Sequence, residues 1–195
     1  CSRVIQEDLG NVFRPVQLGY GTKGGCEAAV HAVRGFINSQ ASLRVILKSD
    51  FANAFNTLRR DVMLERVKCV IPKAYHYAYQ AYAGRSQLFY DEHILYSATG
   101  VQQGDPLGPA FFSLGVHALA TQMQSPLNIW FLDDVVFGGK AEDVLADFEL
   151  LKRRSAELGL ELHEGKCELI FVNPNNENVD RISRCFAAVA PAIKT

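Results

Sequence analysis

Apolar residues along this chain fall into short continuous runs separated by longer stretches with helical spacing. The continuous runs predict strands at residues 43–47, 128–132, 135–137 and 167–172. Two further short runs, residues 87–90 and 94–97, flank Asp91 and Glu92 and predict a hairpin. The chain therefore alternates between the two kinds of element, and no internal repeat is evident.

The stretches with helical spacing predict helices at residues 26–37, 61–67, 72–82, 110–123 and 142–158. Asp61 is a plausible N-cap, Pro72 suits the first turn of a helix, and Gly159 is a typical stop. Residues 2–9 predict a short helix ended by Gly10. The segment 173–195 begins with a polar, asparagine-rich run and ends in an alanine-rich piece whose state the pattern leaves open.

Two adjacent acids, Asp133 and Asp134, stand between the apolar runs 128–132 and 135–137, which Gly138-Gly139 closes. This pattern predicts two strands joined at the acidic pair, with the glycines as an exit. Neighbouring side chains alternate faces along a strand, so an acidic pair inside one would put a charge into the core. A hairpin tip presents both carboxylates to solvent or to a metal ion. A polar turn decorated with two aspartates is the plainer alternative.

A third acid, Asp50, falls where the predicted strand 43–47 ends. If that strand end lies beside the hairpin, the three carboxylates form a compact acidic cluster. Mg²⁺ takes hard oxygen ligands and usually keeps waters and substrate phosphates. Two such ions, roughly 3.5–4 Å apart, can clamp the attacking and leaving oxygens of a displacement at phosphorus. Taken alone, Asp50 is more simply a helix N-cap or turn residue.

A glycine- and proline-rich loop, Gly100-Val101-Gln102-Gln103-Gly104-Asp105-Pro106-Leu107-Gly108-Pro109, separates the two acidic segments and enters an apolar helix. Such a loop exposes backbone amides where phosphate or base edges can approach. The acidic strand, this loop, the Phe131-Leu132-Asp133-Asp134 hairpin and the segment 159–166 follow one another in that order. The set resembles the palm motifs of reverse transcriptases, and is most similar to the non-LTR (LINE-type) retrotransposon enzymes.

The resemblance implies a set of metal-binding residues. It makes Asp50 the first metal ligand and Asp133 the second, bridging two Mg²⁺ ions, with Mn²⁺ as a substitute. Asp134 supports the site as a further acidic residue near the ions. The backbone carbonyl of Phe51 is expected near the metal and the triphosphate.

The resemblance also implies a nucleotide site. Phe55 matches the bulky gate under the incoming sugar, which disfavours a ribose 2′-hydroxyl. Gln103 and Gly104 line the nucleotide and template pocket, and Lys166 matches a proton donor to the departing pyrophosphate. From the residues alone, Phe55 is equally a core aromatic and Lys166 a solvated lysine in a polar turn.

Two positions depart from the family pattern. His163 stands where the family commonly has asparagine, which puts contacts at that position in doubt. Leu132 is bulkier than the frequent alanine, which affects packing at the acidic turn but leaves the ligand set unchanged.

The fold class implied is α+β: a polymerase palm, an RRM-like antiparallel sheet with helices packed on one face, plus part of the fingers. Residues 1–40 correspond to partial fingers and the fingers–palm junction, which contains the loop 17–19. Residues 41–173 correspond to the palm and 174–195 to a linker toward an absent thumb. The implied function is an RNA-directed DNA polymerase of a retroelement, with an RNA template, a DNA primer and deoxynucleoside triphosphates.

Composition agrees with one globular unit, since 195 residues with 48% hydrophobic and 21% charged residues can bury a sizeable core. No apolar run reaches the roughly 18 residues of a membrane span. Five scattered cysteines without a C-x-x-C pair argue against a zinc module. They favour reduced thiols in an intracellular compartment, nuclear or cytoplasmic.

The net charge of −1 is low for a protein that holds a nucleic-acid duplex. A fragment that lacks basic fingers positions and the thumb accounts for it, and the first residue, Cys1, agrees. Such a fragment is expected to have weak or no activity alone. Two alternatives stay open. An RNA-dependent RNA polymerase usually places an aspartate where Phe55 stands, and a domesticated palm serves as a binding module without polymerisation.

Overall fold

A four-stranded antiparallel sheet in the order β4-β5-β1-β6 forms the centre of the computed structural model, which describes residues 2–39, 42–174 and 176–195. The strands are β1 Arg44–Ser49, β4 Leu127–Phe131, β5 Asp134–Gly139 and β6 Glu168–Val172. Strand β1 lies in the middle, paired with β5 on one side and β6 on the other. The predicted strands and the antiparallel α+β fold are confirmed.

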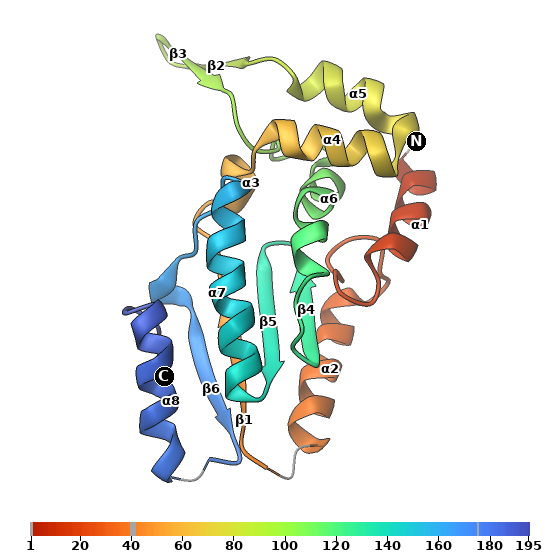
Figure 1. Ribbon diagram of the computed structural model, residues 1–195. Coiled ribbons are helices and arrows are strands. Elements are labelled where there is room, and N and C mark those ends of the chain that lie inside the picture. Colours follow the sequence, from red (N-terminus) through yellow and green to blue (C-terminus); the bar gives the residue numbers. More distant parts are fainter. Residues whose placement is uncertain (1, 40–41, 175) are drawn as a thin grey trace.

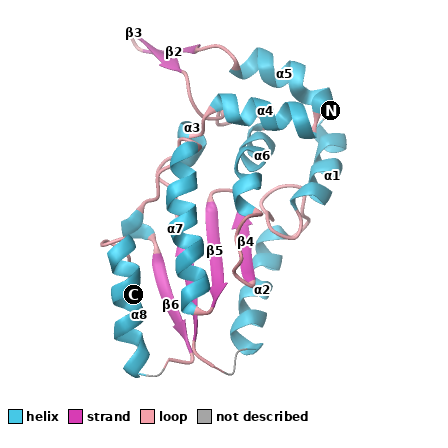
Figure 2. Cartoon of the chain, viewed as in Figure 1, coloured by secondary structure: helices cyan, strands magenta, loops and turns pink. Residues whose placement is uncertain are grey.

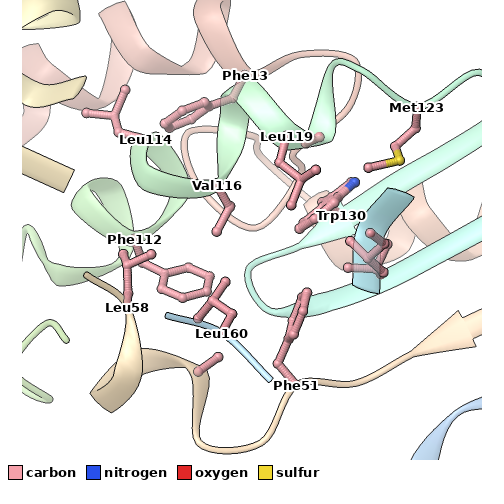
Figure 3. Packing of buried hydrophobic residues seen from close by; sticks show 14 of the residues in the cluster. Phe13, Phe51, Leu58, Phe112, Leu114, Val116, Leu119, Met123, Trp130 and Leu160 are labelled. Carbon is pink, nitrogen blue, oxygen red and sulfur yellow. The ribbon is translucent and has the colours of Figure 1, made fainter. Parts of the chain in front are cut away.

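Alternation along the strands separates a core face from an opposite face. Leu47, Phe137 and Leu169 stand side by side in the register of β1 with its two neighbours, and all are buried. Ile46 and Val136 point the other way, as the period of two requires. Trp130 is fully buried on the core face with Phe51, Phe112 and Leu160 close by (Figure 3).

Helices cover the core face and also reach the opposite one. Helix α7, Ala141–Glu157, packs against β1 and β5, with α6, Gly108–Ala120, beside it (Figure 1). Helix α2, Gly25–Ser39, lies against β4 on the opposite face, where Leu127 and Ile129 form a second small cluster. The sheet therefore carries a helix on both faces, whereas the sequence predicted helices on one face only.

Most of the remaining helices gather at the end of the sheet where the acidic turn lies (Figure 1). Helix α4, Arg60–Val70, packs against α5, Pro72–Tyr82, and against α6, while α1, Ser2–Phe13, contacts α6 as well. The predicted hairpin is present as β2, Ser86–Tyr90, and β3, His93–Ser97, and it projects away from the rest of the chain (Figure 2). A short helix α3, Ala54–Thr57, follows β1.

Three local predictions from glycine and capping chemistry are wrong. Helix α1 continues through Gly10 to Phe13. A Cβ at Gly10 would meet the Gly21 carbonyl oxygen at 2.6 Å, so this glycine permits a close approach and does not end the helix. Gly138 lies inside β5, where a Cβ would meet Leu127 at 2.9 Å, so it is not an exit. Helix α4 begins at Arg60 after the N-cap Arg59, so Asp61 lies in the first turn instead of capping it.

The segment after β6 is more ordered than its sequence indicates. Residues Asn176–Val189 form helix α8, which packs on α7. Ile182, Phe186 and Ala190 join the core, and the Phe186 ring stacks on Phe148 with centroids 6.3 Å apart. This part of the chain is therefore a folded helix in contact with α7.

None of the helices in the described part of the chain is both long enough and apolar enough to cross a membrane. The cysteines that the structure describes, Cys26, Cys69, Cys167 and Cys185, are free thiols.

Candidate active site

Asp50 is the first residue after the central strand β1. Its backbone carbonyl accepts a hydrogen bond from the His163 N–H at 2.8 Å, and the next residue forms an isolated bridge with Leu162. These bonds tie the end of β1 to the segment that precedes the 3₁₀ helix Glu164–Lys166. The Asp50 side chain is 20% exposed, so its carboxylate is held close to the sheet end and still reaches solvent.

Asp133 and Asp134 lie at the turn between β4 and β5. Phe131 pairs with Asp134, which leaves Leu132 and Asp133 as a two-residue loop. Leu132 has a φ of 58°, in the left-handed region that favours glycine. Because Ser49 pairs with Val135 in the β1–β5 ladder, the position of Asp50 continues directly alongside Asp134. The structure thus brings the three predicted acids to one end of the sheet.

The charges in this cluster act on one another. Burial raises the pKa of Asp133, and the charges of Asp134 and Asp50 raise it further, while Lys166 opposes them. Lys166 Nζ lies 3.0 Å from Asp50 Oδ2. Its side chain is 61% exposed, so this ion pair contributes little to stability. The cluster therefore keeps an excess of negative charge at a partly buried position.

The donor set fits a hard divalent cation. As the side chains stand, no group of three histidine, cysteine or acidic residues within the described ranges is close enough to hold an ion. Mg²⁺, however, commonly binds through one or two carboxylates and completes its shell with waters and substrate phosphates. Asp50 and Asp133 supply that chemistry, and the excess negative charge around Asp133 favours a cation. Lys166 then has to leave Asp50 Oδ2.

The raised pKa of Asp133 makes a prediction about stability. A carboxyl group with a raised folded-state pKa destabilises the folded protein when ionised, so stability rises as the pH falls through that pKa. We expect Asp133→Asn to raise the melting temperature at pH 7 without divalent ions by roughly 2–4 °C, about 1 kcal/mol. The gain should disappear toward acidic pH, where Asp133 is protonated.

Thermal unfolding across this pH range measures the effect. Asp143→Asn is the matched control, because Asp143 is exposed in the first turn of α7, where a negative charge is favourable. The control should not gain stability. A lower melting temperature for Asp133→Asn at pH 7 would show that Asp133 is not strained by its neighbours.

Phe55 lies on helix α3, just beyond Asp50 along the chain. Its half-buried ring stacks on the buried Phe112 of α6, with centroids 4.4 Å apart and planes 9° from parallel. The Phe55 carbonyl accepts a hydrogen bond from the Val101 N–H at 2.6 Å. The ring is therefore fixed in place while one side remains partly open, and it lies at the start of the glycine-rich loop.

The loop that carries Gln103 and Gly104 is held at both ends while its tip is exposed. Asp105 accepts hydrogen bonds from the Tyr82 hydroxyl and, at 2.8 Å, from the Leu107 N–H. Burial and this bond to Asp105 raise the pKa of Tyr82, which stays a neutral donor. Gly104 has a φ of 97°, and a Cβ at this position would meet nothing within 4 Å, so the tip is open to a ligand.

A buried arginine completes this support. The Arg60 guanidinium donates to the carbonyl oxygens of Gly84, Ser97 and Gly100, at 3.1, 2.9 and 2.8 Å. It also lies 5.4 Å from the centroid of the Tyr82 ring. These bonds join the base of the β2–β3 hairpin to the start of the loop. Sequence reasoning missed both Arg60 and Tyr82, because their partners are distant along the chain.

The predicted site residues form two adjoining groups. Asp50, Asp133, Asp134 and Lys166 make up the acidic group at the end of the sheet. Phe55 and the loop with Gln103 and Gly104 make up the second. Phe51 is buried as a whole, with 3% of the residue exposed, and its ring packs near Trp130 (Figure 3).

Residues 1–183 match the sequence model of the family described as reverse transcriptase (RNA-dependent DNA polymerase). No curated protein sequence matches the chain.

Solved structures of telomerase share the fold. Apo telomerase from Candida tropicalis, truncated from its C-terminal domain, superposes with a TM-score of 0.68 at 13% identity, covering 90% of this chain and 41% of that one. A second apo telomerase structure from that organism gives a TM-score of 0.67 at 12% identity, covering 89% of this chain and 36% of that one.

Telomerase from Candida albicans, in complex with a TWJ fragment of telomeric RNA, gives a TM-score of 0.57 at 11% identity. That match covers 87% of this chain and 34% of the other. This chain thus spans about two-fifths or less of the length of these proteins.

Proposed function

Because the chain belongs to the reverse transcriptase (RNA-dependent DNA polymerase) family, we propose that it forms the catalytic palm of an RNA-directed DNA polymerase. The observation that carries the proposal is the register of β1 with β5, which sets Asp50 beside the Asp133–Asp134 turn. The reaction is the transfer of a deoxynucleotide from its triphosphate to a primer 3′-hydroxyl, with release of pyrophosphate. An RNA strand serves as the template.

Asp50 and Asp133 are the residues that would hold a pair of Mg²⁺ ions, with Asp134 and the Phe51 carbonyl next to them. When bound, such ions make the 3′-hydroxyl a better nucleophile and stabilise charge on the leaving oxygens. The chain's own side chains do the rest. Lys166, once released from its ion pair with Asp50, would give a proton to the departing pyrophosphate. Its exposure leaves it free to move.

Phe55 is proposed as the residue that selects deoxynucleotides. The sugar of an incoming nucleotide passes over the ring, and a 2′-hydroxyl would collide with it. The stack on Phe112 prevents the ring from turning away. Gln103 and Gly104 line the other side of the pocket, at the exposed tip of the loop that Asp105 holds.

We assign the subtype as non-LTR, on the sequences of the loop 100–109 and the hairpin 131–134. Residues 41–173 then form the palm, and residues 1–40 part of the fingers and their junction with it. Free thiols suit an intracellular compartment, which such an enzyme needs. The net charge of −1 implies that much of the grip on the RNA–DNA duplex comes from other parts of the parent protein.

Primer extension tests the proposal. The protein that carries this chain should extend a DNA primer on an RNA template with deoxynucleotides and Mg²⁺. If the primer is extended with ribonucleotides but not with deoxynucleotides, the result would instead favour an RNA-dependent RNA polymerase. Absence of any product from a folded protein, with Mg²⁺ and with Mn²⁺, would contradict the proposed activity and favour a binding role.

A further inference from the structure

A buried glutamine from the N-terminal segment contacts the acidic turn. The Gln17 side chain is fully buried, and its amide lies beside Leu132, which is 115 positions away in the sequence. Gln17 Oε1 accepts hydrogen bonds from the N–H groups of Leu132, at 2.8 Å, and Gly19, at 2.9 Å. Gln17 Nε2 donates to the Leu132 carbonyl at 3.2 Å. One side chain therefore binds both backbone polar groups of Leu132.

Backbone bonds fix the position from which Gln17 reaches the turn. The Trp130 N–H donates to the Val16 carbonyl, and the Leu18 N–H donates to the Trp130 carbonyl, both at 2.8 Å. Gln17 and Trp130 thus form a parallel bridge at the edge of β4. The amide cannot slide along the strand without breaking these bonds.

Leu132 needs such support because of its backbone conformation. Its φ of 58° is unfavourable for a bulky residue, and such residues persist only when their surroundings over-determine them. Gly19 closes the other side of the turn, since a Cβ there would meet the Leu132 nitrogen at 2.6 Å. The residue after Leu132 is Asp133, so the direction of the Asp133 side chain depends on how Leu132 is held.

We propose that Gln17 is a positioning residue, which holds Leu132 in its left-handed conformation and thereby directs the Asp133 carboxylate toward Asp50. The inference rests on the proposed function, in which Asp133 binds a divalent cation. Gln17 itself touches neither the ion nor the substrate. Without its amide the turn is free to relax to a commoner backbone conformation, and the two carboxylates lose their shared geometry.

The binding of Mn²⁺ to the chain, followed by electron paramagnetic resonance, tests the inference without relying on polymerase activity. Gln17→Met keeps the size of the side chain and removes its three hydrogen bonds. We expect Mn²⁺ affinity to fall about 10- to 100-fold, as is typical when a residue that orients a metal ligand is lost.

Asn128→Leu is the matched control for lost stability. Asn128 also lies on β4, and its amide binds the Ala120 carbonyl and the Trp130 indole N–H, at 2.8 and 3.0 Å. These bonds are on the core side of the strand, away from the turn. The control should lower the melting temperature and leave Mn²⁺ affinity unchanged. An equal loss of affinity in Asn128→Leu would overturn the inference, because general destabilisation would then explain both results.

Gly19→Ala perturbs the same contact without removing the glutamine, and it decides the matter if Gln17→Met does not fold. Its new Cβ pushes on the Leu132 nitrogen, so Mn²⁺ affinity should fall here too. Gly35→Ala is its control, since a Cβ at Gly35 meets nothing within 4 Å.

Asp133→Asn distinguishes a failure of the proposed metal site from a failure of the positioning role of Gln17. If it leaves Mn²⁺ affinity unchanged, the proposed metal site itself is wrong. If Asp133→Asn weakens binding while Gln17→Met and Gly19→Ala do not, only the positioning role of Gln17 is rejected. Loss of affinity in all three, with both controls unaffected, supports the inference.

Discussion

Asp133→Ala is expected to slow nucleotide incorporation at least about a thousandfold. A metal ion contributes several kcal/mol of transition-state stabilisation, and each 1.4 kcal/mol lost slows the reaction about tenfold. Asp133 lies at the turn between β4 and β5, next to the positions of Asp134 and Asp50. Burial raises the pKa of Asp133 and the charges of both neighbours raise it further, as expected for three acids in one cluster. Without the Asp133 carboxylate, the two proposed metal ions lose the ligand that they share.

Single-turnover primer extension on an RNA template measures this loss. Asp143→Ala is the control, because it removes an exposed aspartate from the first turn of α7. The variant Asp133→Asn is expected to be more stable than the natural protein, so its inactivity cannot come from unfolding. Incorporation by Asp133→Ala within tenfold of the natural rate would remove Asp133 from the chemistry.

Phe55→Ala is expected to raise the ratio of ribonucleotide to deoxynucleotide incorporation by about 10- to 200-fold, the range that a steric difference in a binding pocket usually gives. The ring lies parallel to that of Phe112 at 4.4 Å, and in the proposed site this stack would keep it in the path of a 2′-hydroxyl. Truncation to alanine opens that space. The rate of deoxynucleotide incorporation should change less, because a deoxynucleotide has no 2′-hydroxyl for the ring to exclude.

Competition between the two nucleotide types in one reaction gives the ratio directly. Phe89→Ala is the matched control, because Phe89 lies on the projecting hairpin and is 74% exposed. An unchanged ratio in Phe55→Ala would show that the aromatic ring is a packing residue only.

Local patterns predicted most elements of this fold, because each strand and helix buries one face and its periodicity records that. They failed where a distant contact decides the local structure. Gly10 and Gly138 look like breakers in sequence, yet each permits a close approach by another segment. Helix α8 was missed because of its polar start, although Ile182, Phe186 and Ala190 recur every four residues, as one helical face requires.

The sequence indicates which residues form the candidate site but not how they are arranged. The acidic residues and the loop 100–109 stand out in sequence through their order along the chain, since each feature alone is common in turns. Nothing in the sequence gives the register of β1 against β5, which is what sets Asp50 beside the acidic turn. The contact of Gln17 with Leu132 is likewise invisible, since a glutamine in a loop carries no local signal of its partner.

Lys166 connects the present side-chain arrangement with the proposed one. Its pairing with Asp50 satisfies part of the negative charge at the end of the sheet. In the proposed site a divalent cation would carry more charge and bind both carboxylates, so we expect it to displace the lysine. The position of Lys166 is therefore a marker of whether the acids are free to bind an ion.

A crystal structure with Mn²⁺ and a non-hydrolysable deoxynucleoside triphosphate tests the account most directly, through the anomalous scattering of the metal. We expect anomalous peaks shared by the carboxylates of Asp50 and Asp133, with Lys166 moved from Asp50 toward the triphosphate. Bound nucleotide without a metal peak at these two residues, and with Lys166 still paired to Asp50, would contradict it.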